Sequence, residues 1–239
     1  MANPIITLTT DYGTNDHLVG TLKGVILKVN PDVTIVDITH NVTPFDLLDG
    51  GTERRPILVS AGNQYFVAPD NGVLSVIYER EPENLLVRHA NAEHYYFQPV
   101  SKTFHGRDIF APVAAWLTKN WQPSSMGEEI QDYKRFALPR PKEAEGALKG
   151  VVLRTDSFGN LVTNFRQEDL PEGALNGGAI NLQIGNQAVT RFVETFAQGN
   201  GAEPFAYLGS SGFVEIGVNK GNAARTLGLN RGMAVVLTK

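Results

Sequence analysis

The sequence predicts an α/β protein built from a Rossmann-like N-terminal domain and an antiparallel C-terminal β-barrel domain. Residues 5–38 have a strand, helix and strand pattern, residues 136–149 are rich in Pro, Lys, Glu and Ala, and short strand candidates separated by Gly and Asn follow. This change in composition and pattern predicts a first domain at residues 1–138, a linker at 139–147 and a second domain at 148–239.

The first domain opens with a parallel unit. Residues 5–9 form a short apolar strand, apolar residues recur at helical spacing over 18–29, and Pro31 ends the helix before a second strand over 33–38. A right-handed connection makes the two strands parallel, and ligands of such units bind beyond the carboxyl ends of the strands. The polar residues at those ends are Asp11, Asp37, Thr39 and His40.

The later elements are shorter. Further strands of the first domain are expected over residues 57–59, 65–68 and 85–87, with a turn signal at 70–72. Such short strands also fill the second domain, where Gly185-Asn186 predicts a hairpin turn and the spacing is typical of a small antiparallel barrel or sandwich. The second-domain strands are expected over residues 151–153, 161–165, 180–184, 187–192, 213–218 and 233–237.

Residues 103–108, Thr-Phe-His-Gly-Arg-Asp, are the leading candidate for a catalytic segment, because they run into the apolar pattern of a helix. The amide groups at a helix start attract anions, and a His in such a turn is a base near neutral pH, so His105 suits activation of water. A purely structural interpretation is also open. In it Asp108 caps the helix, Pro112 occupies the first turn, and His105 is a hydrogen-bonded loop residue.

Composition excludes several classes of protein. The 239 residues are 42% hydrophobic with a net charge of -4 and a pI of about 5.7, so no broad basic face for nucleic acid is indicated. The chain has no Cys, and its five His residues are not spaced as a metal cluster. Dinucleotide, triphosphate and zinc-protease motifs are absent. No apolar run reaches membrane-spanning length and no basic segment followed by an apolar stretch opens the chain, so we expect a cytoplasmic protein without nucleic acid or membrane partners.

Six short motifs follow the order of one known family. They lie at residues 9–13, 36–40, 51–55, 69–72, 104–108 and 156–160, and read Thr-Thr-Asp-Tyr-Gly, Val-Asp-Ile-Thr-His, Gly-Thr-Glu-Arg-Arg, Pro-Asp-Asn-Gly, Phe-His-Gly-Arg-Asp and Asp-Ser-Phe-Gly-Asn. With them the chain resembles the adenosine-forming S-adenosyl-L-methionine hydrolases, also called S-adenosyl-L-methionine hydroxide adenosyltransferases, which are related to fluorinases and chlorinases. The resemblance implies attack of water or hydroxide on the ribose 5′ carbon, releasing adenosine and L-methionine without a cofactor. It also implies a homotrimer whose substrate sites lie between the first domain of one subunit and the second domain of the next.

The resemblance further implies roles for single residues. Arg54 and His105 would flank the attacking water; because a guanidinium stays protonated, Arg54 would stabilise hydroxide, and His105 would accept the proton or organise the water. Asp11 would bind the ribose hydroxyls, since a carboxylate accepts from two hydroxyls at once. The other implied substrate-binding residues are Phe45 and Phe158 against adenosine, Asp70 in its motif, Asn160 at the purine, Asp156, Ser210 and Glu215 at the polar groups of methionine, and the backbone of Val218 at adenine; no metal ligand is implied.

These residues also have structural interpretations. Arg54 would form a surface ion pair, Asp11 would cap a turn, and Glu215 would be an outward-facing strand residue. Phe45 and Phe158 would be ordinary core residues.

One part of the family pattern is missing. In the family a helix and a strand precede the Gly-Thr-Glu-Arg-Arg motif, whereas here residues 47–50 abut Gly51 directly. The gap corresponds to roughly 25 residues at typical element lengths. It contains the family's catalytic Asp, whose role Asp49 does not take because its spacing from Arg54 differs. Loss of an interior strand would also leave unpaired backbone groups. A gap in the recorded sequence, a real deletion with a substitute residue, and a defective paralogue are the open explanations.

The motifs favour a water-dependent hydrolase. A halide-using relative is one alternative, although retention of Thr-Glu-Arg-Arg and Phe-His-Gly-Arg favours water. A catalytically impaired protein that binds S-adenosylmethionine or adenosine is the other alternative, suggested by the missing Asp.

Overall fold

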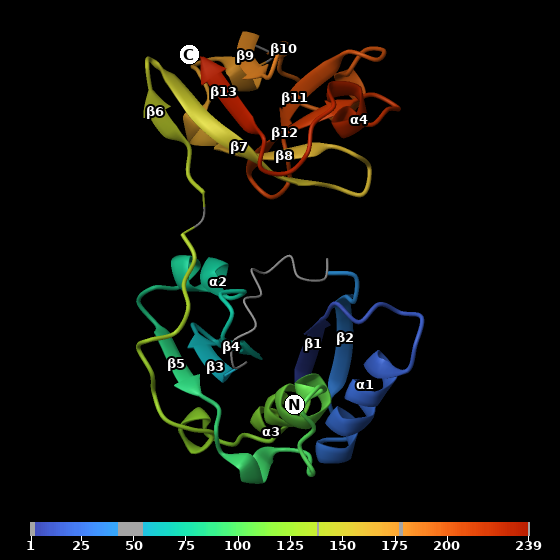
Figure 1. Ribbon diagram of the computed structural model, residues 1–239, viewed down its shortest axis with the longest axis vertical. Helices are drawn as coiled ribbons and strands as arrows, with labels where there is room; N and C mark the ends of the chain where they lie inside the picture. Colours follow the sequence, from blue (N-terminus) through green and yellow to red (C-terminus); the bar gives the residue numbers. More distant parts are fainter. Residues whose placement is uncertain (1–2, 43–54, 138, 177–178, 239) are drawn as a thin grey trace. The chain divides into compact units, whose positions relative to one another are not determined.

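The computed structural model describes residues 3–42, 55–137, 139–176 and 179–238. The chain forms two compact units, Met1–Leu138 and Pro139–Lys239, and each has its own strands and core (Figure 1). The first unit mixes helices with parallel and antiparallel strands, and the second is a strongly curved antiparallel sheet. The predicted α/β fold class with a C-terminal β-barrel is therefore confirmed.

The first unit begins with the predicted parallel pair. Strands β1 (Ile5–Thr9) and β2 (Thr34–Thr39) are joined by helix α1 (Leu18–Val29). Ile6 lies opposite Ile35, and both pack with apolar residues of α1. Helix α3 (Ala111–Leu117) covers the same cluster and follows directly on a π-helical turn, Gly106–Phe110.

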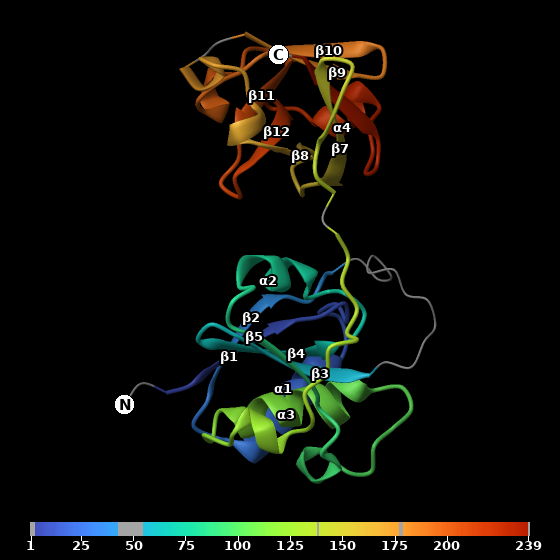
Figure 2. The ribbon, with the colours of Figure 1, turned by 90° about the vertical axis from the view of Figure 1, so that its left-hand side faces the viewer.

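A second, antiparallel sheet completes the first unit, with the strand order β4 (Gln64–Pro69), β3 (Pro56–Ala61), β5 (Leu85–His89). Alternate residues of β3 face opposite layers: Val59 packs with Tyr78 of α2 (Ser75–Arg80), and Leu58 packs with Val113 of α3. Figure 2 shows α2 on one side of the strands and α1 with α3 on the other. Helix α2 is not among the elements that the sequence predicts, because its six residues are too short for a helical period.

The second unit is an antiparallel sheet in the order β10-β9-β13-β7-β8-β12-β11, with β6 added beside β7. A bridge between Phe192 and Ala206 brings its two ends together, so the sheet nearly closes into a barrel. The short helix α4 (Ala223–Leu227) ends at Gly228, whose φ of 66° is left-handed. The strands are β6 (Lys142–Ala144), β7 (Ala147–Thr155), β8 (Leu161–Arg166), β9 (Ala179–Ile184), β10 (Gln187–Arg191), β11 (Pro204–Leu208), β12 (Phe213–Val218) and β13 (Ala234–Thr238).

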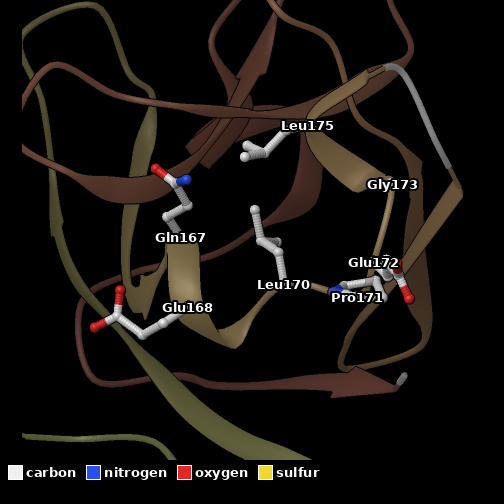
Figure 3. Close-up of a pocket in the computed structure, with 7 residues that line it drawn as sticks. All are labelled: Gln167, Glu168, Leu170, Pro171, Glu172, Gly173 and Leu175. Atoms are coloured by element: carbon white, nitrogen blue, oxygen red, sulfur yellow. The ribbon is translucent and has the colours of Figure 1, made fainter.

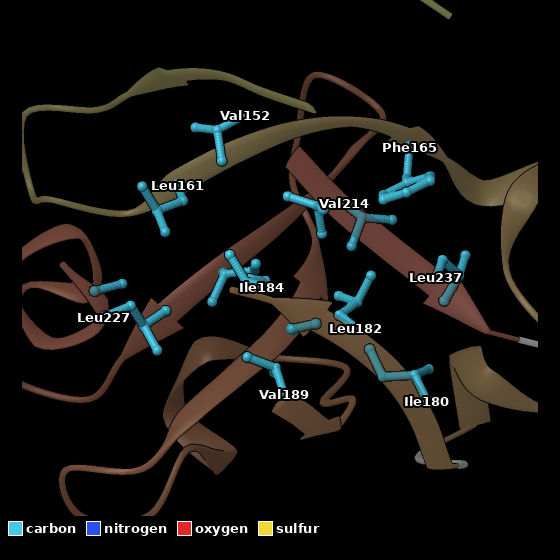
Figure 4. Close-up of a cluster of buried hydrophobic side chains, with 14 of the residues drawn as sticks. Val152, Leu161, Phe165, Ile180, Leu182, Ile184, Val189, Val214, Leu227 and Leu237 are labelled. Carbon is cyan, nitrogen blue, oxygen red and sulfur yellow. The ribbon is translucent and has the colours of Figure 1, made fainter. Parts of the chain in front are cut away.

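The barrel interior is a continuous apolar cluster. Figure 4 shows side chains from β7, β8, β9, β10, β12, β13 and α4 meeting inside it. Leu161, Leu182 and Leu237 are fully buried. Single turns of 3₁₀ helix lie at Glu93–Tyr95, Pro123–Ser125, Gln167–Asp169, Ala174–Asn176 and Phe196–Gln198.

The stretch predicted as a linker contains strand structure. Residues 142–144 pair with the start of β7 through a tight turn in which Glu145 and Gly146 have φ values of 57° and 76°. Both central residues of this turn are left-handed, as in the type I′ turns of β-hairpins. The polar, largely exposed β6 strand has no apolar alternation, which is why its sequence resembles a linker. Strand β11 was likewise not predicted.

Candidate active site

His105 lies at the start of the π-helical turn that leads into α3. Its backbone is already helical, with φ of −62° and ψ of −24°, and its side chain is half-buried. Nδ1 is buried, and no described residue forms a hydrogen bond with it. A buried ring nitrogen without a protein partner is a candidate for binding a water or a ligand atom. π-Helical turns are frequent at functional sites.

Asp108 holds this turn in place through its side chain. It is fully buried and accepts hydrogen bonds from the Ser101 backbone N–H at 2.7 Å and from Arg107 Nε at 2.6 Å. Burial works to raise the pKa of Asp108, but the bonds from Arg107 and Ser101 outweigh it and lower the pKa below its ordinary value. Asp108 makes no side-chain cap of the helix, so the capping interpretation of this residue is wrong. The Arg107 guanidinium forms an ion pair with Asp108 instead of facing a site for a bound anion.

The loop after β1 lies directly against this turn. The Tyr12 ring contacts Phe104 edge-on at 5.6 Å, and a Cβ built on Gly106 would lie 2.3 Å from the Tyr12 hydroxyl oxygen. The Gly13 N–H donates to the His40 carbonyl at 2.7 Å, which ties the same loop to the end of β2. The exposed Asp11 and the half-buried His105 therefore belong to two loops that touch.

The polar residues at the end of β2 are paired among themselves. Lys23 donates to Asp37 Oδ2 at 2.6 Å, and His40 Nε2 lies 3.1 Å from Asp37 Oδ1. The hydrogen bond from Lys23 is the main cause of the lowered pKa of Asp37. His40 Nδ1 is 2.9 Å from Thr10 Oγ1, so this group links the ends of β1 and β2.

Asp70 is committed to internal contacts. Its Oδ2 accepts from Arg55 Nη2 at 2.6 Å, and its Oδ1 accepts from the Lys134 backbone N–H at 2.8 Å. Arg55 also forms a 3.0 Å ion pair with Asp132. The side chain of Asp70 is 4% exposed. This geometry gives Asp70 a structural role, in addition to the substrate contact that the family resemblance implies.

In the second unit, Asp156 organises the loop between β7 and β8. Its Oδ1 accepts from the backbone N–H groups of Phe158 and Asn160, and its Oδ2 accepts from the Asn160 side chain at 2.9 Å. These bonds leave the Phe158 ring 78% exposed, so it is not the core residue of the structural interpretation. Asn160 is buried, and no described residue donates to its Oδ1.

Glu215 lies on β12 beside the same loop. It is 9% exposed, and its Oε2 accepts a 2.6 Å hydrogen bond from the Tyr207 hydroxyl, so it is not an outward-facing strand residue. Burial and this carboxylate raise the pKa of Tyr207. Ser210 is exposed on the loop that joins β11 to β12, and Val218 is buried at the end of β12. The structure thus brings Asp156, Asn160 and Glu215 into one half of the second unit.

Two predicted residues, Phe45 and Arg54, lie outside the described residues. Within the described part of the chain, no group of three or more His, Asp or Glu side chains is placed to hold a metal ion. No described helix is long and apolar enough to cross a membrane.

A cavity of about 490 Å³ lies elsewhere in the second unit (Figure 3). None of the predicted site residues lines it. Its lining residues are Gln167, Glu168, Leu170, Pro171, Glu172, Gly173 and Leu175.

The domain models of one known family match both units. The model of the SAM hydroxide adenosyltransferase C-terminal domain matches residues 150–236, and the model of the N-terminal domain matches residues 6–52 and 49–127. The chain belongs to the SAM hydroxide adenosyltransferase family. The N-terminal match consists of two segments that overlap at residues 49–52, the point at which the sequence analysis expects an interruption of the family pattern.

Named relatives cover nearly the whole chain of this family member. The (R)-S-adenosyl-L-methionine hydrolase of Salinispora tropica is 32% identical over 260 residues, covering 96% of this chain and 95% of the relative. That of Thermus thermophilus is 30% identical, covering 95% and 97%. The fluorinase of Actinoplanes sp. is 28% identical, covering 99% and 98%. Hydrolases and halide-using enzymes are therefore both among the relatives.

Solved structures share the fold. An uncharacterized conserved protein from Thermotoga maritima has a TM-score of 0.87 and 31% identity, with 98% of this chain and 100% of that chain covered. A conserved hypothetical protein from Thermus thermophilus has a TM-score of 0.76 and 28% identity, covering 98% and 99%.

Some site residues were missed by sequence reasoning. Tyr12 and Tyr207 contact predicted site residues, but a single tyrosine in a loop or strand gives no pattern from which a partner can be inferred. For Tyr207 a signal existed: it lies two residues before the glycine loop that leads to Glu215, at hairpin spacing.

Proposed function

We propose that the protein hydrolyses S-adenosyl-L-methionine to adenosine and L-methionine. The observation that carries the proposal is the buried Nδ1 of His105, which has no hydrogen-bond partner among the described residues and lies on a turn that touches the Asp11 loop. A ring nitrogen in this state suits a bound water, and the neighbouring carboxylate suits the ribose hydroxyls. Membership of a family of S-adenosylmethionine-using enzymes supports the substrate.

The chemistry asks little of the protein. The water oxygen forms a bond to the ribose 5′ carbon, the bond from that carbon to sulfur breaks, and its electron pair stays on sulfur. Because a sulfonium departs as a neutral thioether, neither a general acid nor a cofactor is required. The remaining tasks are to align the water with the breaking bond, to take up its proton, and to exclude bulk solvent.

Residue roles follow from this division of tasks. His105 accepts the proton or organises the water, Arg54 stabilises hydroxide, and Asp11 binds the ribose hydroxyls. The rings of Phe45 and Phe158 enclose adenosine, and the exposed Phe158 ring offers a free face for it. The second-unit residues Asp156, Asn160, Ser210, Glu215 and Val218 bind the purine and the methionine end, with Asp70 supporting its loop. We further propose that the protein is a cytoplasmic homotrimer in which the sites are completed between subunits.

A second candidate function is binding without turnover. The observation in its favour is the alignment with the S. tropica hydrolase, which spans 260 residues although this chain has 239. The family resemblance implies that the extra residues of the relatives include the family's catalytic Asp. A chain without that carboxylate would retain the ligand contacts of both units but hold the water less well.

One incubation tests these functions together. The purified chain is mixed with S-adenosylmethionine in a chloride-containing buffer made with water enriched in heavy oxygen. The products are separated and their masses are determined by mass spectrometry. Heavy oxygen in adenosine supports hydrolysis, whereas a 5′-halogenated adenosine would identify a halide-using enzyme. Intact substrate together with calorimetric binding would identify a binding protein and contradict the hydrolase proposal.

A further inference from the structure

The turn that carries Asp11 is held by the segment that follows β2. The Thr10 N–H donates to the Thr39 carbonyl at 2.9 Å, and the Gly13 N–H donates to the His40 carbonyl at 2.7 Å. Asp11 lies between these two anchors and is exposed, and its carboxylate has no hydrogen-bond partner among the residues that the structure describes. The position of this carboxylate is therefore set by the backbone on either side of it.

The Thr10 hydroxyl shapes that backbone. Its oxygen accepts a 3.4 Å hydrogen bond from the Tyr12 N–H, two residues further along the chain. A Ser or Thr hydroxyl that accepts from a backbone N–H at this spacing closes a small turn, and Asp11 is the middle residue of the turn. Because the bond is long, it is weak by itself, and a second partner that fixes the hydroxyl adds to the stability of the turn.

His40 is this second partner. Its side chain is buried, and Nδ1 lies 2.9 Å from Thr10 Oγ1. Nε2 lies 3.1 Å from Asp37 Oδ1, although the direction of approach is not that of a hydrogen bond. The hydrogen bond from Lys23 lowers the pKa of Asp37, so a carboxylate faces Nε2 and favours the tautomer with the proton there. Nδ1 then accepts from the Thr10 hydroxyl, whose lone pairs stay free for the Tyr12 N–H.

We propose that His40 is a positioning residue for the ribose of the substrate, because its ring fixes the Thr10 hydroxyl and with it the turn that presents Asp11. The inference rests on the proposed function, which places the ribose hydroxyls at Asp11. Hydrogen bonds from two vicinal hydroxyls to one carboxylate depend on distance and direction. His40 therefore contributes to the selection of a ribonucleoside over a nucleoside that lacks these hydroxyls, and it needs no ligand contact of its own.

The test measures, in the full chain and by calorimetry, the ratio of the affinities for adenosine and 2′,3′-dideoxyadenosine. We expect the wild type to prefer adenosine roughly tenfold or more, the contribution of a hydrogen bond to a charged group. Asn places a polar atom near the position of Nδ1 of a His ring, whereas Gln places one near Nε2. His40→Asn is therefore expected to retain the preference, and His40→Gln is expected to reduce it to roughly twofold or less.

Variants of Thr10 test the same contact from its other side. Thr10→Ser retains the hydroxyl and is expected to retain the preference, whereas Thr10→Val loses the hydroxyl and is expected to reduce the preference as His40→Gln does. Thr118→Val is the matched control, because the Thr118 hydroxyl accepts from Asn30 Nδ2 at 2.8 Å and so also joins two segments, at the C-terminal end of α1. This control is expected to leave the adenosine preference unchanged.

A double variant separates positioning from general damage to the fold. Asp11→Ala leaves no carboxylate to position, so the addition of His40→Gln is expected to change the affinity ratio no further. A further change of the ratio in the double variant would overturn the inference, because His40 would then act independently of Asp11.

The single variants give the other decisive outcomes. Equal losses for the two nucleosides in His40→Gln, an unchanged preference in His40→Gln and Thr10→Val, a loss in His40→Asn as large as that in His40→Gln, or no preference in the wild type would overturn the inference. A preference that depends on His40, without turnover of S-adenosylmethionine, would overturn the proposed function alone. Turnover by a wild type whose preference does not depend on His40 would overturn only the positioning role.

Discussion

Tyr12 packs edge-on against Phe104, with ring centroids 5.6 Å apart and ring planes at 77°, and its hydroxyl lies over the backbone of the next turn. The contact joins the loop after β1 to the turn that carries His105. Two segments that are far apart in the sequence are thereby held together by one aromatic pair. The position of His105 relative to Asp11 depends on this contact.

Gly106→Ala is expected to disturb that contact. The added Cβ would lie 2.3 Å from the Tyr12 hydroxyl oxygen, so Tyr12 or the turn must move. Overpacking of this kind costs about 1–3 kcal/mol of unfolding free energy, and a shift of His105 is expected to lower turnover as well. Thermal unfolding and the rate of adenosine release measure the two effects.

Gly24→Ala provides the control for this variant. Gly24 lies within α1, and a Cβ there meets nothing within 4 Å. Alanine in a helix interior is expected to stabilise the protein by roughly 0.5–1 kcal/mol. If Gly106→Ala unfolded no earlier than Gly24→Ala, the close approach of Tyr12 would be refuted.

His105→Gln is expected to lower turnover by roughly 10²-fold or more, the usual contribution of a general base. The variant retains a polar side chain of similar length, so the melting temperature is expected to change little. His17→Gln is the control, because His17 is exposed and its backbone carbonyl accepts a hydrogen bond from Thr21 of α1. An unchanged rate of adenosine formation in His105→Gln would exclude His105 from the reaction.

The lowered pKa of Asp108 predicts that the protein loses stability in acid. Its pKa in the folded protein is lowered from an ordinary value of 3.8, so the ionised form is favoured by folding. This contribution is fully present above the ordinary pKa and is lost as the pH falls through the lower folded pKa. The melting temperature is therefore expected to fall below about pH 4, and less steeply in Asp108→Asn.

The control for the acid titration is Glu83→Gln, which changes an exposed carboxylate. It is expected to follow the wild-type curve. A melting temperature of Asp108→Asn that fell with pH as steeply as that of the wild type would show that the buried carboxylate does not stabilise the turn.

A variant of Asp70 distinguishes a structural role of this residue from a ligand-binding role. Because both of its oxygens are bonded internally, Asp70→Asn is expected to lower the free energy of unfolding by about 2 kcal/mol while adenosine affinity stays unchanged. The cost stays moderate because Arg55 retains Asp132. Denaturant unfolding and calorimetry with adenosine decide between the roles, since a weaker affinity at unchanged stability would favour the substrate contact.

The fold was predictable where the pattern was long or regular. Helix α1 and the strand β12 follow from apolar periodicity and have the predicted bounds. The hairpin β6–β7 was hidden because its polar edge strand lacks alternation, and α2 because it is a single short segment. At the site, the motifs predict which loops matter but not their partners. Pairings such as Asp108 with Ser101 depend on side-chain packing between segments, which no local pattern encodes.

Insertion of the missing segment is the final prediction. The face of the β1–β2 pair that turns away from α1 and α3 has Ile5 65% exposed, Val36 42% exposed and Ile38 63% exposed. Parallel strands are normally covered on both faces, so these side chains lack the cover that a further helix would provide. Insertion between Gly50 and Gly51 of the helix and strand that the family resemblance implies at this point is expected to raise both the melting temperature and turnover.

A Gly/Ser insertion of equal length separates cover from mere length. A flexible insertion costs only loop-closure entropy, about 0.6 kcal/mol for each doubling of the loop, and buries nothing. If burial of the exposed face drives the effect, the chain with the natural segment must have a higher melting temperature than this control. The difference must grow with the apolar area covered, which contributes roughly 25 cal/mol per Å². Equal melting temperatures for the two insertions would mean that the chain is complete without the segment, and turnover by the unmodified chain would then require another residue in place of the family's Asp.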